Sequence, residues 1–379
     1  MQKSAHLAQA SLHQTHRRFF PVTGNLIYLN HAAVAPLAQP AAEAMAAWSA
    51  DACNFGAFHY DRWLEAYEKL RLGAARMINA SRSEIALVKN TSEGIATIAL
   101  GIDWRRGDKV VAFREEFPAN YHPWIRLQAK GVRIEWRSIT DSLDSIDQAC
   151  QGARLLAISF VNYLTGYRVD LKAIGDICRR RGTLFLVDAI QGLGAFPLDV
   201  RREGIHALSA DGHKWLLGPE GCGVLYIQED VQDQVEPVEF GWTNVRNYAD
   251  YSSRDMTLRP DAGRYECGTL NTIGCFGLRA AIDFLNEAGI DRVAAEVLDR
   301  SGQLASGVVA KGYELIEPWN RKTGSGIVTF RRPDLDSRLL VKKLRERKIV
   351  AAPRQGWVRA SPHFYISPAD IEEVLAALP

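Results

Sequence analysis

The chain has 379 residues, of which 47% are hydrophobic and 24% charged, and its formal net charge at pH 7 is +2. This composition is typical of a globular protein with a large core, and the balanced charge argues against a nucleic-acid partner. Six scattered cysteines without zinc-ligand spacing argue against a metal site and favour the reducing cytoplasm, and the lack of an apolar run of roughly 20 residues argues against a membrane-spanning helix.

Short β-rich runs alternate with helical patterns between residues 85 and 227. Helices are expected at Ser92–Gly101 and Leu171–Arg181. The apolar runs are interpreted as strands, at Ile85–Val88, Lys109–Phe113, Leu155–Val161, Leu184–Val187 and Gly223–Ile227. Continuous apolar strands that alternate with helices indicate the α/β class, with a mostly parallel sheet that is covered on both faces.

The rest of the chain has a different pattern. Residues 239–266 are polar, aromatic and irregular, which predicts a long functional loop. Two helices, three short strands and a closing helix are expected after it, at Thr272–Ala288, Asp291–Lys311, Gly326–Phe330, Ile349–Ala352, Trp357–Ala360 and Pro368–Leu378. We therefore expect a large domain at 25–268 and a smaller α+β domain at 269–379, joined by an N-terminal segment at 1–24.

Polar or aromatic residues stand where the predicted strands end. They are Asn90-Thr91-Ser92, Glu116-Phe117, Asn162, Asp188 and His213-Lys214. In open parallel sheets, ligands bind beyond the carboxyl ends of the strands. We therefore expect these side chains to converge on one edge of the sheet, whatever the ligand is.

Two of these residues have a specific chemistry. Lys214 lies in an apolar, glycine-bounded turn, where desolvation lowers the pKa of a lysine and makes its amine nucleophilic, as Schiff-base formation requires. Asp188 ends a buried strand and needs a cationic or hydrogen-bonding partner. A pyridoxal 5′-phosphate (PLP) site needs such a lysine together with a carboxylate that keeps the pyridinium nitrogen protonated.

With these motifs the sequence resembles the class-V aminotransferase family of PLP enzymes, which has fold type I and includes cysteine desulfurases, selenocysteine lyases and isopenicillin-N epimerase. The resemblance runs from Tyr28-Leu29-Asn30-His31 to Arg359-Ala360-Ser361-Pro362-His363. Its most specific parts are the Asp188/Gln191 pair and His213-Lys214.

The resemblance implies a role for each site residue. Lys214 would be the Schiff-base lysine and Asp188 the pyridinium partner. The other cofactor contacts would be Gln191 at the 3′-oxygen, His213, Thr91 and Ser92 at the phosphate, Phe117 against the ring, and Asn162 at a cofactor oxygen or the substrate carboxylate. The substrate contacts would be Arg354, Asn30 and His31, with Arg359 as a second candidate for the carboxylate.

Several of these residues also have plainer interpretations. Thr91 and Ser92 open a predicted helix, so they suit a helix cap as well as a phosphate site, and the two are compatible. Asn162 suits a turn. Glu266-Cys267-Gly268-Thr269 resembles a family segment that reaches the phosphate of the neighbouring subunit, so Thr269 implies a homodimer with a shared active site.

The sequence departs from the family pattern at two places. Asp211 stands where the family often has serine. An acid beside a phosphate is unfavourable unless it is protonated or paired. Asp211 could instead orient His213 or a backbone N–H. Cysteine desulfurases carry a nucleophilic cysteine just after the substrate arginine, whereas Arg354 runs into Gln355-Gly356-Trp357, and no cysteine follows Cys275. The persulfide-forming design is therefore disfavoured.

The expected activity is PLP chemistry at the α-carbon of a small amino acid, with Lys214 as general base. C–S lyase or desulfurase-like chemistry is favoured, because it needs only Lys214 and a leaving group. An epimerase, an aminotransferase and a PLP-binding protein without turnover remain alternatives. Epimerisation would need a second acid, for which His122, Tyr163 and Tyr265 are candidates.

Overall fold

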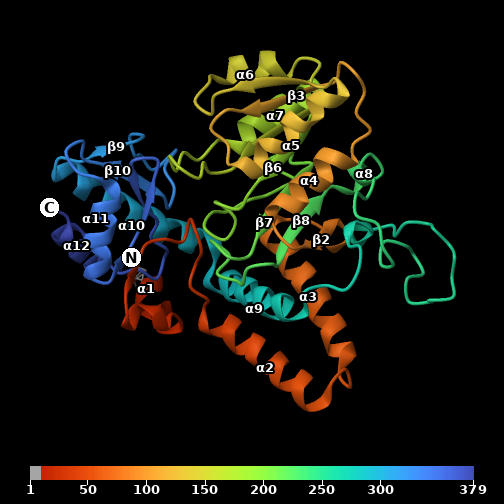
Figure 1. Ribbon diagram of the computed structural model, residues 1–379, viewed down its shortest axis with the longest axis horizontal. Helices are drawn as coiled ribbons and strands as arrows, with labels where there is room; N and C mark the ends of the chain where they lie inside the picture. Colours follow the sequence, from red (N-terminus) through yellow and green to blue (C-terminus); the bar gives the residue numbers. More distant parts are fainter. Residues whose placement is uncertain (1–9) are drawn as a thin grey trace, which may run out of the picture.

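In the computed structural model, which describes residues 10–379, a seven-stranded sheet organises the larger part of the molecule (Figure 1). Its order is β2-β8-β7-β6-β5-β3-β4, and only β8 runs antiparallel to the other strands. The strands are β2 (Ile85–Val88), β3 (Lys109–Phe113), β4 (Arg133–Arg137), β5 (Leu155–Ser159), β6 (Leu184–Asp188), β7 (Ala207–Asp211) and β8 (Gly223–Ile227). The predicted α/β class with a mostly parallel sheet is confirmed.

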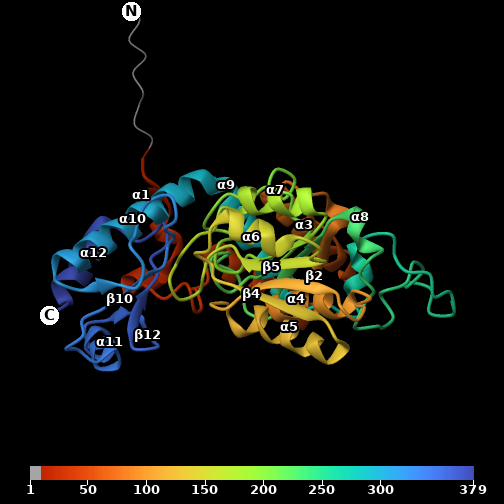
Figure 2. The same ribbon diagram turned by 90° about the horizontal axis from the view of Figure 1, so that it is seen from above.

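Helices cover both faces of this sheet, and alternate residues of each strand point into two separate cores. Val110 and Leu155 pack with α4 (Thr91–Gly101) and α5 (His122–Leu127). Their neighbours Val111 and Leu156 pack on the opposite face with α6 (Leu143–Cys150) and α7 (Leu171–Arg181). Figure 2 shows the two helical layers above and below the strands. This double burial explains why the inner strands of the sheet are mostly apolar.

A helical hairpin extends from the side of the large sheet (Figure 1). It consists of α2 (Gln39–Phe55) and α3 (Tyr60–Ile78), and α9 (Thr272–Ala288) packs against both. The contact places α9 beside the large sheet, although the sequence assigns its residues to the small domain. The boundary at residue 268 stays a prediction.

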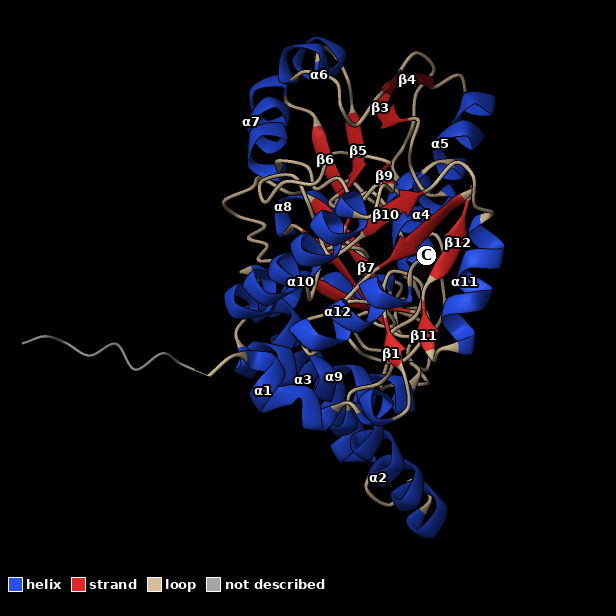
Figure 3. Ribbon diagram, turned by 90° about the vertical axis from the view of Figure 1, so that its left-hand side faces the viewer, coloured by secondary structure: helices blue, strands red, loops and turns tan. Residues whose placement is uncertain are grey.

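The C-terminal part forms a smaller α+β lobe (Figure 3). Its antiparallel sheet has the order β12-β13-β10-β9, and a separate strand β11 pairs in parallel with β1 (Ile27–Tyr28). The N-terminal helix α1 (Leu12–His16) contacts α10 of this lobe. The lobe comprises α10 (Ile290–Ala310), β9 (Glu314–Leu315), β10 (Val328–Arg331), α11 (Ser337–Glu346), β11 (Ile349–Val350), β12 (Ala352–Arg354), β13 (Trp357–Ala360) and α12 (Pro368–Ala377).

Short helices and one long loop complete the chain. The loop between α8 (Glu229–Gln232) and residue 261 is irregular, as predicted, and extends away from the body of the molecule (Figures 1 and 2). Short 3₁₀ helices lie at Arg17–Phe19, Pro21–Gly24, Arg82–Glu84, Pro118–Asn120, Gln128–Lys130 and Ala262–Tyr265. Within residues 10–379, no helix has the length and apolar character to cross a bilayer.

Candidate active site

The antiparallel direction of β8 places the Lys214 turn at the carboxyl edge of the sheet. Because β7 runs with its neighbours and β8 runs back, the connection between Asp211 and Gly223 lies where the parallel strands end. Asp188 ends β6 at the same edge, opposite Ser209 of β7 and Ser159 of β5. The topology therefore brings the lysine turn and the strand-end residues together.

Burial makes the amine of Lys214 less basic than an ordinary lysine, so a larger share of it is neutral and nucleophilic. Desolvation lowers its pKa from 10.5 to about 8; the charge of Asp188 acts in the opposite direction, and those of Arg359 and Arg354 lower the pKa further. The amine lies 5.8 Å from the centre of the Phe117 ring. A partly neutral amine beside an aromatic face can attack an aldehyde.

Asp188 is fully buried, and desolvation raises its pKa to about 6. One of its carboxylate oxygens accepts the backbone N–H of Ile190 at 3.1 Å, and the charge of Lys214 also favours its ionised form. The two side chains thus lie close enough for each charge to act on the other. A cation placed beside Asp188, such as a protonated ring nitrogen, would supply the partner that its buried carboxylate needs.

A second buried carboxylate near Asp188 belongs to Glu116. Its oxygens accept the backbone N–H of Ser159 at 2.6 Å and the Ser159 hydroxyl, while desolvation, and to a lesser extent the charge of Asp188, raise its pKa to about 8. Glu116 was noted in the sequence only as a strand-end residue. Its contact with Ser159 follows from the pairing of β3 with β5, which a single sequence does not show.

The start of α4 forms the side of the site where a phosphate is expected. Thr91 is the first helical residue, and its Oγ1 accepts the backbone N–H of Asp211 at 2.9 Å. The side chain of Asn90 caps the helix at the N–H of Glu93, and Ser92 is exposed. Free N–H groups at a helix start attract anions, so the cap and the phosphate site remain compatible.

Phe117 and two arginines lie near Lys214. Phe117 is 46% exposed, and its ring meets Tyr163 edge to face at 5.3 Å between centroids. Arg354, on β12, is exposed, whereas Arg359, on β13, is 2% exposed and donates to the carbonyl of Tyr163 at 2.7 Å. The Nε of Arg359 is buried and has no hydrogen-bond partner among residues 10–379.

Gln191 and Asn162 are held by the protein itself. The amide of Gln191 donates to the carbonyl of Ala32 and accepts from the indole of Trp215, both at 2.9 Å. Asn162 donates to the carbonyl of Glu115 at 2.7 Å and accepts from the turn that follows it. Each amide keeps one further N–H, so both are fixed groups with a single hydrogen left for a ligand.

Asn30 and His31 lie at the junction with the C-terminal lobe. His31 is fully buried; its Nδ1 contacts the carbonyl of Ser361 at 2.7 Å and its Nε2 the hydroxyl of Tyr365 at 2.6 Å. Desolvation lowers its pKa to about 4, so the ring is neutral. Both ring nitrogens are therefore engaged in the fold, whereas Oδ1 of Asn30 is buried without a partner in the described part of the chain.

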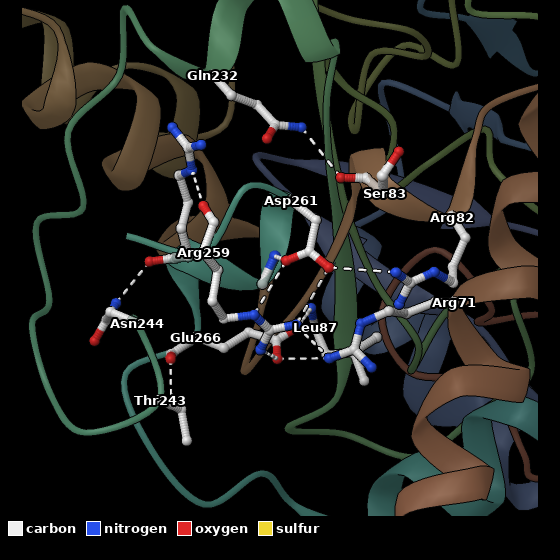
Figure 4. A network of polar contacts seen from close by, with 12 residues as sticks. Arg71, Arg82, Ser83, Leu87, Gln232, Thr243, Asn244, Arg259, Asp261 and Glu266 are labelled. Carbon is white, nitrogen blue, oxygen red and sulfur yellow. Dashed lines mark hydrogen bonds and ion pairs between the residues drawn. The ribbon is translucent and has the colours of Figure 1, made fainter. Parts of the chain in front are cut away.

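The segment that contains Thr269 is anchored by Glu266 (Figure 4). The buried Glu266 carboxylate accepts from Arg71 of α3, with N–O distances of 2.6 and 2.5 Å, and from the backbone N–H of Leu87 at 2.8 Å. Its backbone carbonyl accepts the hydroxyl of Thr243, which ties the base of the long loop to the same point. Thr269 itself is exposed at the surface.

These residues fit the cofactor that the resemblance implies. The edge offers a buried acid without a direct ion pair among residues 10–379, an amine of lowered pKa, an aromatic face and a helix start, each suited to one part of PLP. The unpartnered polar atoms of Asn30 and Arg359 leave capacity for further ligand atoms. No cluster of His, Cys, Asp and Glu in residues 10–379 is arranged to hold a metal ion.

The chain is similar to known proteins over nearly its whole length. The profile of the family Aminotransferase class-V matches residues 27–372. A probable cysteine desulfurase of Methanothermobacter thermautotrophicus is 32% identical over 384 residues, which cover 94% of each chain. The apo structure of a cysteine desulfurase from Thermococcus onnurineus NA1 matches 97% of each chain, with a TM-score of 0.90 and 27% identity. The complex of the cystine C–S lyase C-DES with its product cysteine persulfide matches 94% of this chain and 98% of that one, with a TM-score of 0.87 and 25% identity.

Proposed function

This chain belongs to the aminotransferase class-V family, and we propose that it is a PLP-dependent C–S lyase of the desulfurase type that acts on a small sulfur-bearing amino acid. The observation that carries the proposal is the pairing of Lys214 with Asp188 at the carboxyl edge of the sheet. A lysine amine and a carboxylate at one edge of a sheet can serve the aldehyde carbon and the ring nitrogen of one pyridine ring. The names of the relatives favour cysteine or cystine as the substrate class.

Each residue of the site has a distinct task in this reaction. When bound, PLP supplies an electron sink that stabilises negative charge at the α-carbon of an amino acid. Asp188 keeps the ring nitrogen protonated, and Phe117 covers the ring. Lys214 would hold the cofactor through its amine and, as general base, accept the proton of the α-carbon.

Two arginines are available for the substrate carboxylate. Arg354 is the residue that the resemblance indicates, but its side chain is exposed. Arg359 is buried, charged and has a free Nε, and desolvation lowers its pKa to about 10. A guanidinium that lacks an acidic partner gains more from a carboxylate than an exposed one does, so we assign Arg359 the inner contact and Arg354 the outer one.

The arrangement favours elimination over epimerisation. Elimination of a β-sulfur group needs the base Lys214 and a leaving group, whereas epimerisation also needs an acid on the opposite face. Of the candidates for that acid, Tyr265 is buried and donates to the carbonyls of Gln232 and Val235, and His122 is exposed. Tyr163 lies beside Phe117 and keeps the epimerase as a second candidate.

A shared active site in a homodimer is part of the proposal. Thr269 is exposed although Glu266 fixes its segment rigidly, and this combination suits a residue that serves a neighbouring subunit. The apolar side chains of Phe58 and Tyr251, which are largely exposed, offer area for such contacts. Cytoplasmic location is supported by the six free cysteines.

Absorbance of the purified protein and of Lys214→Ala tests the proposal. The wild type is expected to show the visible band of lysine-linked PLP, and the variant to lose it while it keeps its fold. Incubation with cysteine, cystine and alanine should release sulfur products from the first two, with no loss of optical activity from the third. An unchanged band in Lys214→Ala would contradict the attachment point, and racemisation of alanine without sulfur release would favour the epimerase.

A further inference from the structure

Asp211 departs from the family pattern inside the site, where the resemblance gives a serine. It is the last residue of β7, and its side chain is buried. Its Oδ2 lies 3.0 Å from Nδ1 of His213, a distance for an ion pair, although the angles are not those of a hydrogen bond. Oδ1 has no hydrogen-bond partner within residues 10–379. A buried carboxylate of this kind depends on the polarity of the groups around it, among which His213 lies at ion-pair distance.

The turn between the two residues fixes their contact. A Cβ at Gly212 would lie 2.8 Å from both the carbonyl oxygen of Cys222 and Cδ1 of Leu278, so only glycine permits this path of the chain. The backbone N–H of Asp211 donates to Oγ1 of Thr91 at 2.9 Å. The pair is therefore held against the first residue of α4, where the N–H groups of the helix attract an anion.

We propose that Asp211 is a positioning residue that holds the Nδ1 edge of His213 and so directs Nε2 toward the phosphate of the cofactor. The two nitrogens lie on different edges of the imidazole ring, so a partner at Nδ1 sets where Nε2 points. Asp211 acts through His213 and does not itself contact the cofactor. The contact also gives the acid that replaces serine a polar neighbour other than the phosphate. The inference rests on the proposed function, since it requires PLP.

Comparison of PLP with pyridoxal, which lacks the phosphate, tests the role of Asp211. The dissociation constants of both compounds are measured on cofactor-free wild type, Asp211→Asn, His213→Phe and the double variant. Asp211→Asn is expected to weaken PLP binding by about tenfold, the size of one charge-assisted contact, and to leave pyridoxal binding unchanged. The double variant is expected to bind PLP no more weakly than His213→Phe alone, because Asp211 works only through that ring.

Three results would overturn the inference. Equal weakening of PLP and pyridoxal in Asp211→Asn would indicate a general structural role. Tighter PLP binding would show that the acid repels the phosphate. Additive losses in the double variant would separate Asp211 from His213. If the asparagine variant fails to fold, Asp211→Ala is measured in its place and the same pattern is expected. Wild type that binds neither compound would refute the proposed function itself, which the other results leave intact.

Discussion

The pKa of Lys214 should move in opposite directions when its two kinds of charged neighbour are removed. Burial lowers this pKa, the charge of Asp188 raises it, and the charge of Arg354 lowers it. Asp188→Asn removes the stabilising anion and is expected to lower the pKa of Lys214 below about 8. Arg354→Gln removes a repelling cation from an exposed position and is expected to raise it.

The same pKa gives the fraction of Lys214 that is neutral and able to react. At pH 7 an amine with a pKa of about 8 is about 9% neutral, whereas one at the ordinary value of 10.5 is about 0.03% neutral. Because only the neutral amine attacks an aldehyde, Lys214 is about 300 times more available than a surface lysine. Burial alone therefore gives the site most of its readiness to take up the cofactor.

Competitive acylation of the cofactor-free protein measures this pKa without relying on PLP. Acetic anhydride is applied across a pH range that brackets 8, and the labelling of Lys214 is followed by peptide mass spectrometry. Lys130, on the surface, serves as the internal reference and should label alike in all three proteins. A wild-type midpoint near 10.5, or a shift of both variants in the same direction, would refute the reasoning.

Two further predictions concern the partner subunit and the second buried acid. Thr269→Asp should weaken cofactor binding. A mixture of this variant with Lys214→Ala should regain activity that neither protein has, because one site of each hybrid dimer is then intact. A mixture that stays inactive under conditions of subunit exchange would contradict the shared site. Burial raises the pKa of Glu116 from 4.5 to about 8, so between these pH values the folded state binds more protons than the unfolded state. This residue therefore makes the free energy of unfolding fall as the pH rises, by up to about 1.4 kcal/mol per pH unit. Glu116→Gln should remove that slope in urea titrations, and an unchanged slope would place the titration elsewhere.

The sequence predicts the strands and helices of the sheet well because both faces of the sheet are buried. In Lys109–Phe113 and Gly223–Ile227 every residue after the first is apolar, and the expected bounds agree with β3 and β8. The strand Arg133–Arg137 lies at the edge of the sheet, alternates charged and apolar residues, and was missed. The buried strand Ala207–Asp211 was also missed, because Ser209 and Asp211 interrupt its apolar pattern. The helices α2 and α3 were missed because their apolar faces meet α9, a partner two hundred residues away.

The site was predicted in part, because some of its residues follow from local sequence patterns and others from contacts between distant segments. Strand ends can be read from a sequence, so the convergence of Lys214 with Phe117 and Asp188 was expected. The engagement of His31 with Ser361 and Tyr365 depends on the docking of the C-terminal lobe, and no local pattern shows it. The burial that separates Arg359 from Arg354 also arises in the folded lobe, where one side chain points inward from β13 and the other lies near the edge on β12.

The long loop and the segment that leads to Thr269 are neighbours in the chain but are held in place by different contacts. The bridge between Val245 and Leu258 closes the long loop at its base, and Arg71 and the N–H of Leu87 hold Glu266 from outside the loop. Residues 246–257 can therefore change in sequence or length while the stretch that ends at Thr269 keeps its position. Loop variants in this region should therefore keep the exposed position of Thr269, which makes the two segments separable by mutation.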